Sequence, residues 1–580
     1  MSENMGKADS IEPKASSVFT NGNIVSVNLN GKLSEEKAFA IKDGKFIAVG
    51  SNEEIEKYAD KQTEIIDLEG KTVLPGFTDS HLHPTSTAEI INDFNVFYVV
   101  SESGLSDRAS VLSAYKEEIA EQLKKRKNAK LLRGVGWEAT FFLSTEEGLP
   151  TCKDLDEVCP DIPVVMRSFC HHYIWVNTKA MELAGIDKNT PEPRNGFIWH
   201  DEDGNPIGIF QETTAIDLFF KRLPMADYTL EEYKEAILEF QKTYANGFGT
   251  TLVFDALPSE KAIHAYHELA ESNRLSMRVN ACFYADPSEG AEQFDTFINN
   301  KSKYNVGDVF DINTVKFFID GSGFSFFMKK PFEKEALEVA GLPEDYRGFS
   351  QWTEAELKDY FEKLNAAGFQ IHVHAMGDAA VSLALDAFEY VAAKADIKKN
   401  RHVIAHIMNT DESEMKRMAK LGIIAAMQPS WCKVYSFQDI SCVSLLGKER
   451  GFNQYPVGRL KKNGVVVSSG TDFPVYIPPN PFEGIQNGIT RRLTKKHPEY
   501  DIYKNTQLGP DEDKMTLEEM IQSYTINGAF QLFRENITGT IEKGKSADFV
   551  ILDKDIMKAL PEDIIDINAE SVYFKGKKVK

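Results

Sequence analysis

Short apolar runs alternate with helical stretches through the centre of the chain. Runs rich in β-branched and apolar residues occur near 75–82, 249–254, 277–284, 313–319, 370–375, 402–407, 422–428 and 465–471. Between them, segments such as YTLEEYKEAILEFQKTYANG carry apolar residues at helical spacing. This alternation predicts an α/β fold with a parallel sheet, and eight strands are the number that closes a TIM (β/α)8 barrel.

The two ends of the chain share a different pattern. Residues 17–74 form short alternating runs separated by Asn-Gly, Asp-Gly and Glu-Gly, which are hairpin signals, and residues 536–580 repeat this pattern. Open strand edges at both ends would favour aggregation, so we predict that the two blocks pair into one composite β-sandwich. The barrel would then occupy residues 75–535 between them.

A long segment, from about 85 to 230, separates the first two predicted barrel strands. It is too long for a loop and contains its own strand-like runs, KLLRGVG and IPVVMRSF, which predicts a large insertion that forms a lid or a subdomain over the barrel mouth. Residues 1–16 are polar and lack the apolar core of a secretory signal. We therefore expect a disordered leader on a cytoplasmic protein.

The composition of the chain argues against some classes of partner but does not indicate a substrate. Hydrophobic residues make up 42% and charged residues 27%, as in folded globular proteins, and 66 Lys and Arg against 88 Asp and Glu give a net charge of −22. Such a surface repels phosphate backbones and anionic lipid, so neither nucleic acid nor a membrane is an expected partner. The six cysteines form no C-x-x-C pair and are expected to be reduced thiols.

The strongest chemical signal is VLPGFTDSHLHP at the end of the first predicted strand. Because side chains alternate along a strand, Asp79, His81 and His83 share one face, where two imidazoles can bind a metal and Asp79 can orient one of them. The alternative for an isolated H-x-H is a pair of hydrogen-bonded core histidines. Four further candidate ligands follow later strands, where a barrel presents functional groups: Lys316, His374, His406 and Asp472.

This set of motifs resembles the amidohydrolase superfamily, and within it the YtcJ-like branch, amidohydrolase family 3, which includes N-substituted formamide deformylases. The resemblance runs from about Ile24 to Asp553 and rests on PGFTDSHLHP, GWEATFF, LPTCKDLDEVCPDIPVVMRS, HHYIWVNTKAMELAGI, VKFFIDGS, HVHAMGDAAV, SSGTDFPV and GTIEKGKSADFVILD.

The resemblance implies a metal site with two zinc ions per chain. His81 and His83 would hold the first ion and His374 and His406 the second, while Asp472 would contact the first ion and act as catalytic base. Lys316 would bridge both ions as a carbamate, because an ammonium has no acceptor, whereas a buried neutral amine can take up carbon dioxide. The alternative is an ammonium paired with Asp320 or Asp472, which leaves a site for one ion.

Other positions are expected to support the site. The resemblance places His172, Trp137 and Glu138 in the substrate pocket, with packing inside the insertion as the alternative. His372 lies two residues before His374 and could replace it as a ligand. Ala405 stands where the family commonly has glutamate, so the task of that glutamate must be missing or performed elsewhere.

Together these observations predict a hydrolase that cleaves a non-peptide carbon–nitrogen bond of a small molecule with a metal-activated water. A mononuclear deaminase or an ester hydrolase of the same superfamily is the first alternative, although the H-x-x-E motif of the deaminases is absent after His374. A non-catalytic scaffold is the second. A homodimer is the default assembly for such an enzyme.

Overall fold

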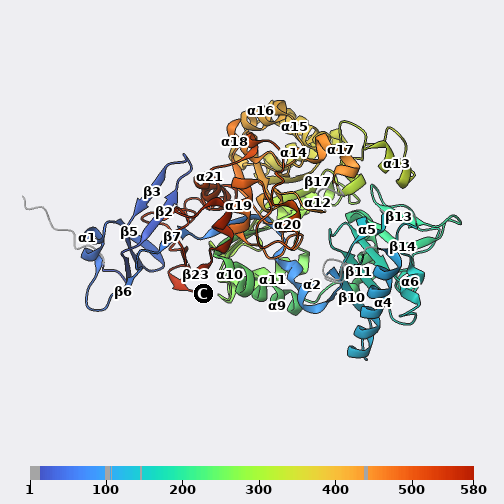
Figure 1. Cartoon of the computed structure of the whole chain (residues 1–580), viewed down its shortest axis with the longest axis horizontal. Helices are drawn as coiled ribbons and strands as arrows, with labels where there is room; N and C mark the ends of the chain where they lie inside the picture. Colours follow the sequence, from blue (N-terminus) through green and yellow to red (C-terminus); the bar gives the residue numbers. More distant parts are fainter. Residues whose placement is uncertain (1–13, 98–104, 106, 144, 146, 437–441) are drawn as a thin grey trace, which may run out of the picture.

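A computed structural model describes residues 14–97, 105, 107–143, 145, 147–436 and 442–580. Within these residues the centre is an eight-stranded parallel sheet with the order β21-β20-β19-β18-β17-β16-β15-β8 (Figure 1). Its strands are β8 (Phe77–Leu82), β15 (Thr250–Asp255), β16 (Arg278–Tyr284), β17 (Phe310–Phe318), β18 (Gln370–Ala375), β19 (Val403–His406), β20 (Ile424–Met427) and β21 (Val467–Ser469). Each overlaps a strand predicted from the sequence, which confirms the TIM barrel.

Helices join consecutive strands and cover the outside of the barrel (Figure 1). They include α9 (Leu230–Phe240), α11 (Glu260–Glu271), α12 (Glu292–Asn300), α14 (Glu354–Ala366), α15 (Asp378–Ala392), α16 (Glu412–Leu421) and α18 (Val457–Lys462). The first strand, β8, and the segment after the last strand, β21, are hydrogen-bonded to each other near their carboxyl ends. There, the backbone N–H of Asp472 donates to His81 O at 2.8 Å, and the N–H of His83 donates to Phe473 O at 2.7 Å.

The two ends of the chain form a β-sandwich, as predicted. One sheet has the order β5-β4-β1-β6, with β1 (Ser17–Thr20), β4 (Ala38–Lys42), β5 (Lys45–Gly50) and β6 (Glu64–Asp67). The other has the order β24-β23-β22-β7-β2-β3, with β2 (Asn23–Val27), β3 (Leu33–Glu36), β7 (Thr72–Pro75), β22 (Phe549–Leu552), β23 (Ala569–Phe574) and β24 (Lys577–Lys578). Phe19 and Phe39 from the first block pack against Phe549 from the last, so both ends build one core.

The insertion after β8 carries its own six-stranded sheet, with the order β13-β14-β12-β11-β10-β9. Its strands are β9 (Phe94–Asn95), β10 (Leu132–Trp137), β11 (Val164–Ser168), β12 (Tyr173–Val176), β13 (Phe197–His200) and β14 (Pro206–Gln211), flanked by α2 (Thr87–Asn92), α4 (Arg108–Lys125), α7 (Thr178–Ala184) and α8 (Thr213–Arg222). Figure 1 shows it at one end of the long axis and the sandwich at the other. Residues 98–104, 106, 144 and 146 of the predicted lid, and residues 1–13 of the predicted leader, lie outside the described residues.

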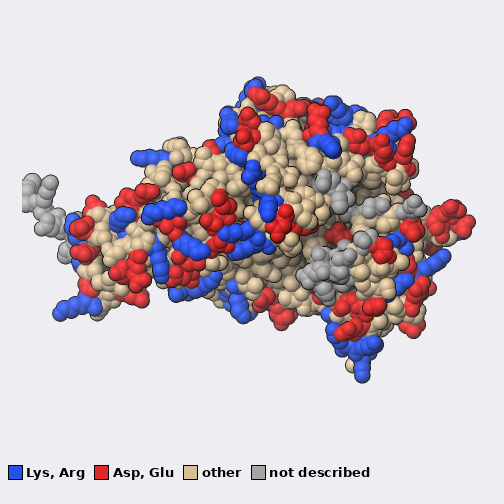
Figure 2. Space-filling model, in the orientation of Figure 1, with Lys and Arg blue, Asp and Glu red and all other residues tan. Residues whose placement is uncertain are grey.

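The structure also bears on three expectations from composition: membrane contact, the state of the cysteines and the distribution of surface charge. No helix among the described residues has the length and apolar character needed to cross a membrane. All six cysteines are free thiols. On the face shown in Figure 2, acidic and basic side chains are interspersed over the sandwich, the barrel and the insertion.

A buried ion pair joins the barrel to the sandwich, and its loss should destabilise the fold. Arg278 on β16 is fully buried and pairs with the equally buried Asp548 just before β22. We expect Arg278→Met to lower the free energy of unfolding by about 3–5 kcal/mol, because it leaves the Asp548 carboxylate without its cation. Denaturant unfolding measures this. Asp308→Asn, which removes a part-exposed partner of Arg278 at 2.8 Å, should cost about 1 kcal/mol or less; equal losses would contradict the argument.

Candidate metal centre and substrate cavity

The six residues predicted as metal ligands lie in one cavity at the carboxyl ends of the barrel strands. The cavity has a volume of about 530 Å³ and extends from the barrel to the insertion. Its lining includes all six side chains: His81, His83, Lys316, His374, His406 and Asp472. Residues up to 391 positions apart in the sequence therefore converge on one space (472 − 81 = 391).

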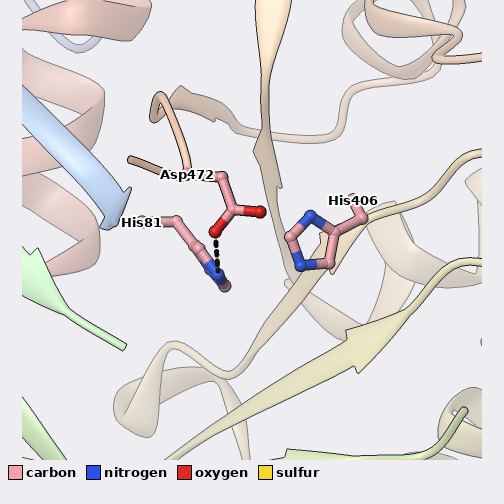
Figure 3. A group of neighbouring side chains, drawn as sticks. All are labelled: His81, His406 and Asp472. Carbon is pink, nitrogen blue, oxygen red and sulfur yellow. Dashed lines mark ion pairs between the residues drawn. The ribbon is translucent and has the colours of Figure 1, made fainter. Parts of the chain in front are cut away.

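His81, His406 and Asp472 form the tightest group. Each offers a ligand atom within 4.8 Å of the other two, and all three are buried. Figure 3 shows the Asp472 carboxylate between the two imidazoles, with His81 Nε2 at 3.4 Å from Asp472 Oδ1. His83 Nε2 lies 3.1 Å from the same oxygen. The His374 ring lies 4.6 Å from that of His406, measured between centroids. This spacing gives a divalent ion several nitrogen and oxygen ligands.

Two members of this group have a strained backbone conformation. His406 and Asp472 have φ values of 75° and 57°, in the left-handed region that side chains with a Cβ rarely adopt. Each such residue costs on the order of 1–3 kcal/mol, a cost that proteins commonly carry at functional sites. His406 ends β19, and Asp472 follows β21, so the chain turns sharply where each side chain enters the cavity.

Three of the imidazoles are held through Nδ1 by a neighbouring side chain. His81 Nδ1 lies 2.8 Å from His372 Nε2, His374 Nδ1 lies 3.2 Å from Asp320 Oδ1, and His406 Nδ1 lies 2.8 Å from Gln428 Oε1. A hydrogen bond at Nδ1 fixes the orientation of the ring and leaves the lone pair of Nε2 for a metal.

Two of these orienting residues were not identified from the sequence. Gln428, just after β20, contacts His406 Nδ1 from the strand next to β19, whereas position 405, where the family commonly has glutamate, is an alanine. Asp320 was considered only as a partner for Lys316. Instead, its carboxylate accepts from the backbone N–H groups of Met376 and Gly377 and contacts His374. The only sequence signal for either residue is its position after a barrel strand.

Lys316 has an unusual environment for a lysine. Its side chain is fully buried on β17, and Nζ has no hydrogen-bond partner among the described residues. The ring of Phe318 lies 4.8 Å away. Burial lowers the pKa of Lys316 to about 8, which makes the neutral amine accessible near physiological pH. Of the two partners considered for an ammonium, neither Asp320 nor Asp472 hydrogen-bonds to Nζ, although the charge of Asp472 opposes the effect of burial on its pKa.

The electrostatics favour a cation in the centre of this group. Burial, followed by the charge of Lys316, lowers the pKa values of His81 and His374 well below the usual value, so both rings are neutral. Burial opposes ionisation of Asp472, but the hydrogen bond to His83 and the electrostatic effect of the neighbouring His406 outweigh it and lower the pKa of Asp472. Neutral imidazoles beside a carboxylate are the state in which these groups bind zinc and related metals.

His372 and Asp79, the two residues expected to support the ligands, both lie next to His81, but their contacts differ from those expected. His372 lies behind His81 and stacks on Phe254 at 4.8 Å, so it supports a ligand and does not point into the cavity as one. The Asp79 carboxylate contacts Thr471 Oγ1 at 2.6 Å and the backbone N–H of His81, not the His81 ring. Asp79 therefore connects the backbone of β8 to the segment that follows β21, where the first and last strands of the barrel meet.

Of the three predicted substrate contacts, one lines the cavity. His172 does so, and its Nδ1 lies 2.9 Å from Glu212 Oε2, while its ring lies 6.1 Å from that of His374. Trp137 is fully buried in the insertion and donates its indole N–H to Met166 O, which corresponds to the packing alternative. Neither Trp137 nor Glu138 belongs to the lining formed by the described residues.

The sequence and the fold of this chain are similar to those of known proteins over nearly its whole length. The chain is 28% identical to YtcJ of Bacillus subtilis (strain 168) over 556 residues, which cover 93% of this chain and 96% of YtcJ. It is 24% identical to an N-substituted formamide deformylase of Arthrobacter pascens over 574 residues, covering 96% and 97%. A solved structure, an uncharacterized metal-dependent hydrolase from Pyrococcus horikoshii OT3, has a TM-score of 0.71 and 25% identity and covers 94% of this chain and 99% of its own.

The match to a family model is similarly extensive. The model described as "Amidohydrolase family" matches residues 64–580, which include the whole barrel, the insertion and the C-terminal part of the sandwich. With the histidines, lysine and aspartate of the family motifs gathered in one cavity, the chain belongs to the amidohydrolase family.

Proposed function

We propose that this protein is a metal-dependent hydrolase that cleaves a non-peptide, amide-type carbon–nitrogen bond of a small molecule. The observation that carries the proposal is the convergence of four histidines, Lys316 and Asp472 on one cavity. The similarity to an N-substituted formamide deformylase along nearly the whole chain supports this type of bond.

The residues of the cavity fit two divalent ions, for which zinc is the metal best suited to these nitrogen and oxygen donors. His81, His83 and Asp472 would hold one ion, and His374 and His406 the other. When bound, the ions supply an activated water at neutral pH and polarise the scissile carbonyl. As a carbamate, Lys316 would supply further oxygen ligands, for which its buried Nζ without a hydrogen-bond partner is the supporting observation.

Asp472 would move the proton that the reaction requires. Its ionised carboxylate accepts the proton of the attacking water and then returns it to the leaving nitrogen, because an amide nitrogen leaves poorly unless it is protonated. Asp472 Oδ1 lies 3.1 Å from His83 Nε2, so the carboxylate is placed beside another of the proposed ligands. His172, held by Glu212, would present its free nitrogen to the substrate from the opposite wall.

Elemental analysis combined with a substrate panel tests this function. Purified protein should contain zinc or a related metal, with two ions per chain, and should hydrolyse members of a panel of formamides, N-acyl amines and cyclic amides. Ammonia released from an amino-substituted ring, with one ion per chain, would favour the deaminase alternative. Metal-free protein with full activity would exclude the proposed mechanism.

Gln428 provides a test of the metal site that does not depend on turnover. Gln428→Leu removes the acceptor that orients His406, so we expect metal affinity to fall by about 10–100-fold. Competition with a chromogenic chelator measures this. Gln428→Glu keeps an acceptor at the same position and should retain most of the affinity; a leucine variant that binds metal as tightly as the wild type would remove Gln428 from this role.

A further inference from the structure

The cavity is lined by several cationic side chains, and apart from Lys316 all but one are saturated by their own partners. The saturated pairs are Arg133 with Asp93 and Glu232 at 3.0 and 3.2 Å, Lys221 with Asp286 and Glu289 at 2.9 Å each, and Lys261 with Asp227 at 2.7 Å. Each of these cations already forms an ion pair with at least one carboxylate of the protein. The exception is Arg167, on β11 of the insertion.

Arg167 keeps one edge of its guanidinium unused. Its Nε lies 3.3 Å from Glu89 Oε1, and the ring of Phe220 covers one face at 5.3 Å. Neither terminal nitrogen hydrogen-bonds to a residue in the described part of the chain, and the side chain keeps 26% of its surface exposed. A guanidinium has donors and no acceptor, so the two terminal nitrogens together require a group with two acceptor oxygens.

The acidic side chains near Arg167 do not occupy its two terminal nitrogens. Glu89 reaches only the Nε edge, and burial raises its pKa. Asp217 also lines the cavity, but burial, with the charge of Asp286, raises its pKa to about 7, so this acid is only partly ionised near neutral pH. Glu89 and Asp93 offset the burial of Arg167 and raise its pKa, but the terminal nitrogens still lack a hydrogen-bond acceptor among the described residues, which leaves a place for an anionic ligand.

We propose that Arg167 binds a carboxylate of the substrate in a bidentate manner, so that the preferred substrates are amides that also carry a carboxylate group. This inference rests on the proposed function and adds a substrate class to it. The chain leads from Arg167 directly to His171 and His172, which line the same cavity beside the metal ligands. One molecule can therefore place its amide among the histidines and its carboxylate on the insertion wall.

The test compares N-acylglycines with the matching N-acylglycinamides, which have the same shape without the charge. In Arg167→Met, kcat/KM for the N-acylglycines should fall by about 10- to 100-fold, mainly through KM, while that for the glycinamides changes by less than about threefold. Arg167→Lys, which keeps the charge without the fork, should give an intermediate loss. Lys221→Met, at a saturated cation of the same cavity, should not discriminate between the two series.

A binding measurement separates this inference from the proposed function. Calorimetry on the metal-loaded Asp472→Asn variant should show N-acetylglycine binding at least about tenfold more tightly than N-acetylglycinamide, and Arg167→Met in that background should abolish the preference. Equal affinities, or equal losses for both series, would overturn the role of Arg167 even if amides are hydrolysed. A carboxylate preference in binding with no hydrolysis of any amide would keep that role and reject the proposed reaction.

Discussion

Replacing Asp472 with asparagine is expected to lower kcat by about 10²- to 10⁴-fold on every amide substrate while folding and metal content are preserved. Asparagine keeps the shape of the side chain and an oxygen that can still contact a metal beside His83, whose Nε2 lies 3.1 Å from Asp472 Oδ1. Its amide cannot accept the proton of the attacking water or return it to the leaving nitrogen. Steady-state kinetics, with elemental analysis of the same sample, measure both quantities.

A matched control uses a second carboxylate of the cavity. Asp217 lines the cavity on α8 of the insertion, away from the histidine cluster, and Asp217→Asn should retain most of kcat. If both variants lost activity equally, the effect would reflect the charge of the cavity and not a proton transfer by Asp472. Undiminished turnover in Asp472→Asn would remove this residue from the mechanism.

Replacing Lys316 with methionine should have a comparably large effect, through the metal. Methionine keeps the length and apolar character of the buried side chain, which packs beside Phe318 on β17, but cannot form a carbamate. We expect the metal content to fall from two ions to one per chain. Activity should fall by more than the roughly 10–100-fold that the loss of an outer-shell partner causes.

Isotope labelling distinguishes a carbamate from a plain lysine. Wild-type protein loaded with metal in the presence of ¹³C-bicarbonate should show a carbamate resonance that is absent from Lys316→Met. Two bound ions in a wild-type protein without the labelled carbon would mean that Lys316 acts as an amine or ammonium. Two bound ions in the methionine variant would mean that Lys316 is not a ligand.

The fold could be predicted from the sequence because its main features are local patterns or follow from them. Parallel strands buried on both faces appear as continuous apolar runs, and the predicted run at 277–284 differs from β16 (Arg278–Tyr284) by one residue. The composite sandwich followed from the need to pair exposed strand edges. The convergence of the candidate ligands on one cavity could be predicted from the rule that barrel enzymes carry functional groups at strand ends.

Sequence analysis missed residues, or assigned them another role, where the role depends on contacts between strands or on a separate core. His372 supports His81 across 291 positions, and nothing near either residue indicates that pairing. Gln428 replaces an expected neighbour of His406 from the adjacent strand, a position set by the sheet register and not by local sequence. Trp137 is buried because the insertion has a core of its own, whose extent could not be judged from a family motif.

The sandwich built from both chain ends also constrains the order of folding during synthesis. β7 ends at Pro75, but its antiparallel neighbour β22 begins only at Phe549, so this edge has no partner until nearly the whole chain has left the ribosome. At about 5–20 residues per second that interval is on the order of a minute. Throughout it, the Phe19 and Phe39 rings lack the Phe549 side chain that completes their packing. A nascent or prematurely terminated chain would therefore expose an unpaired strand edge and an incomplete aromatic core, both of which favour aggregation until β22 is synthesised.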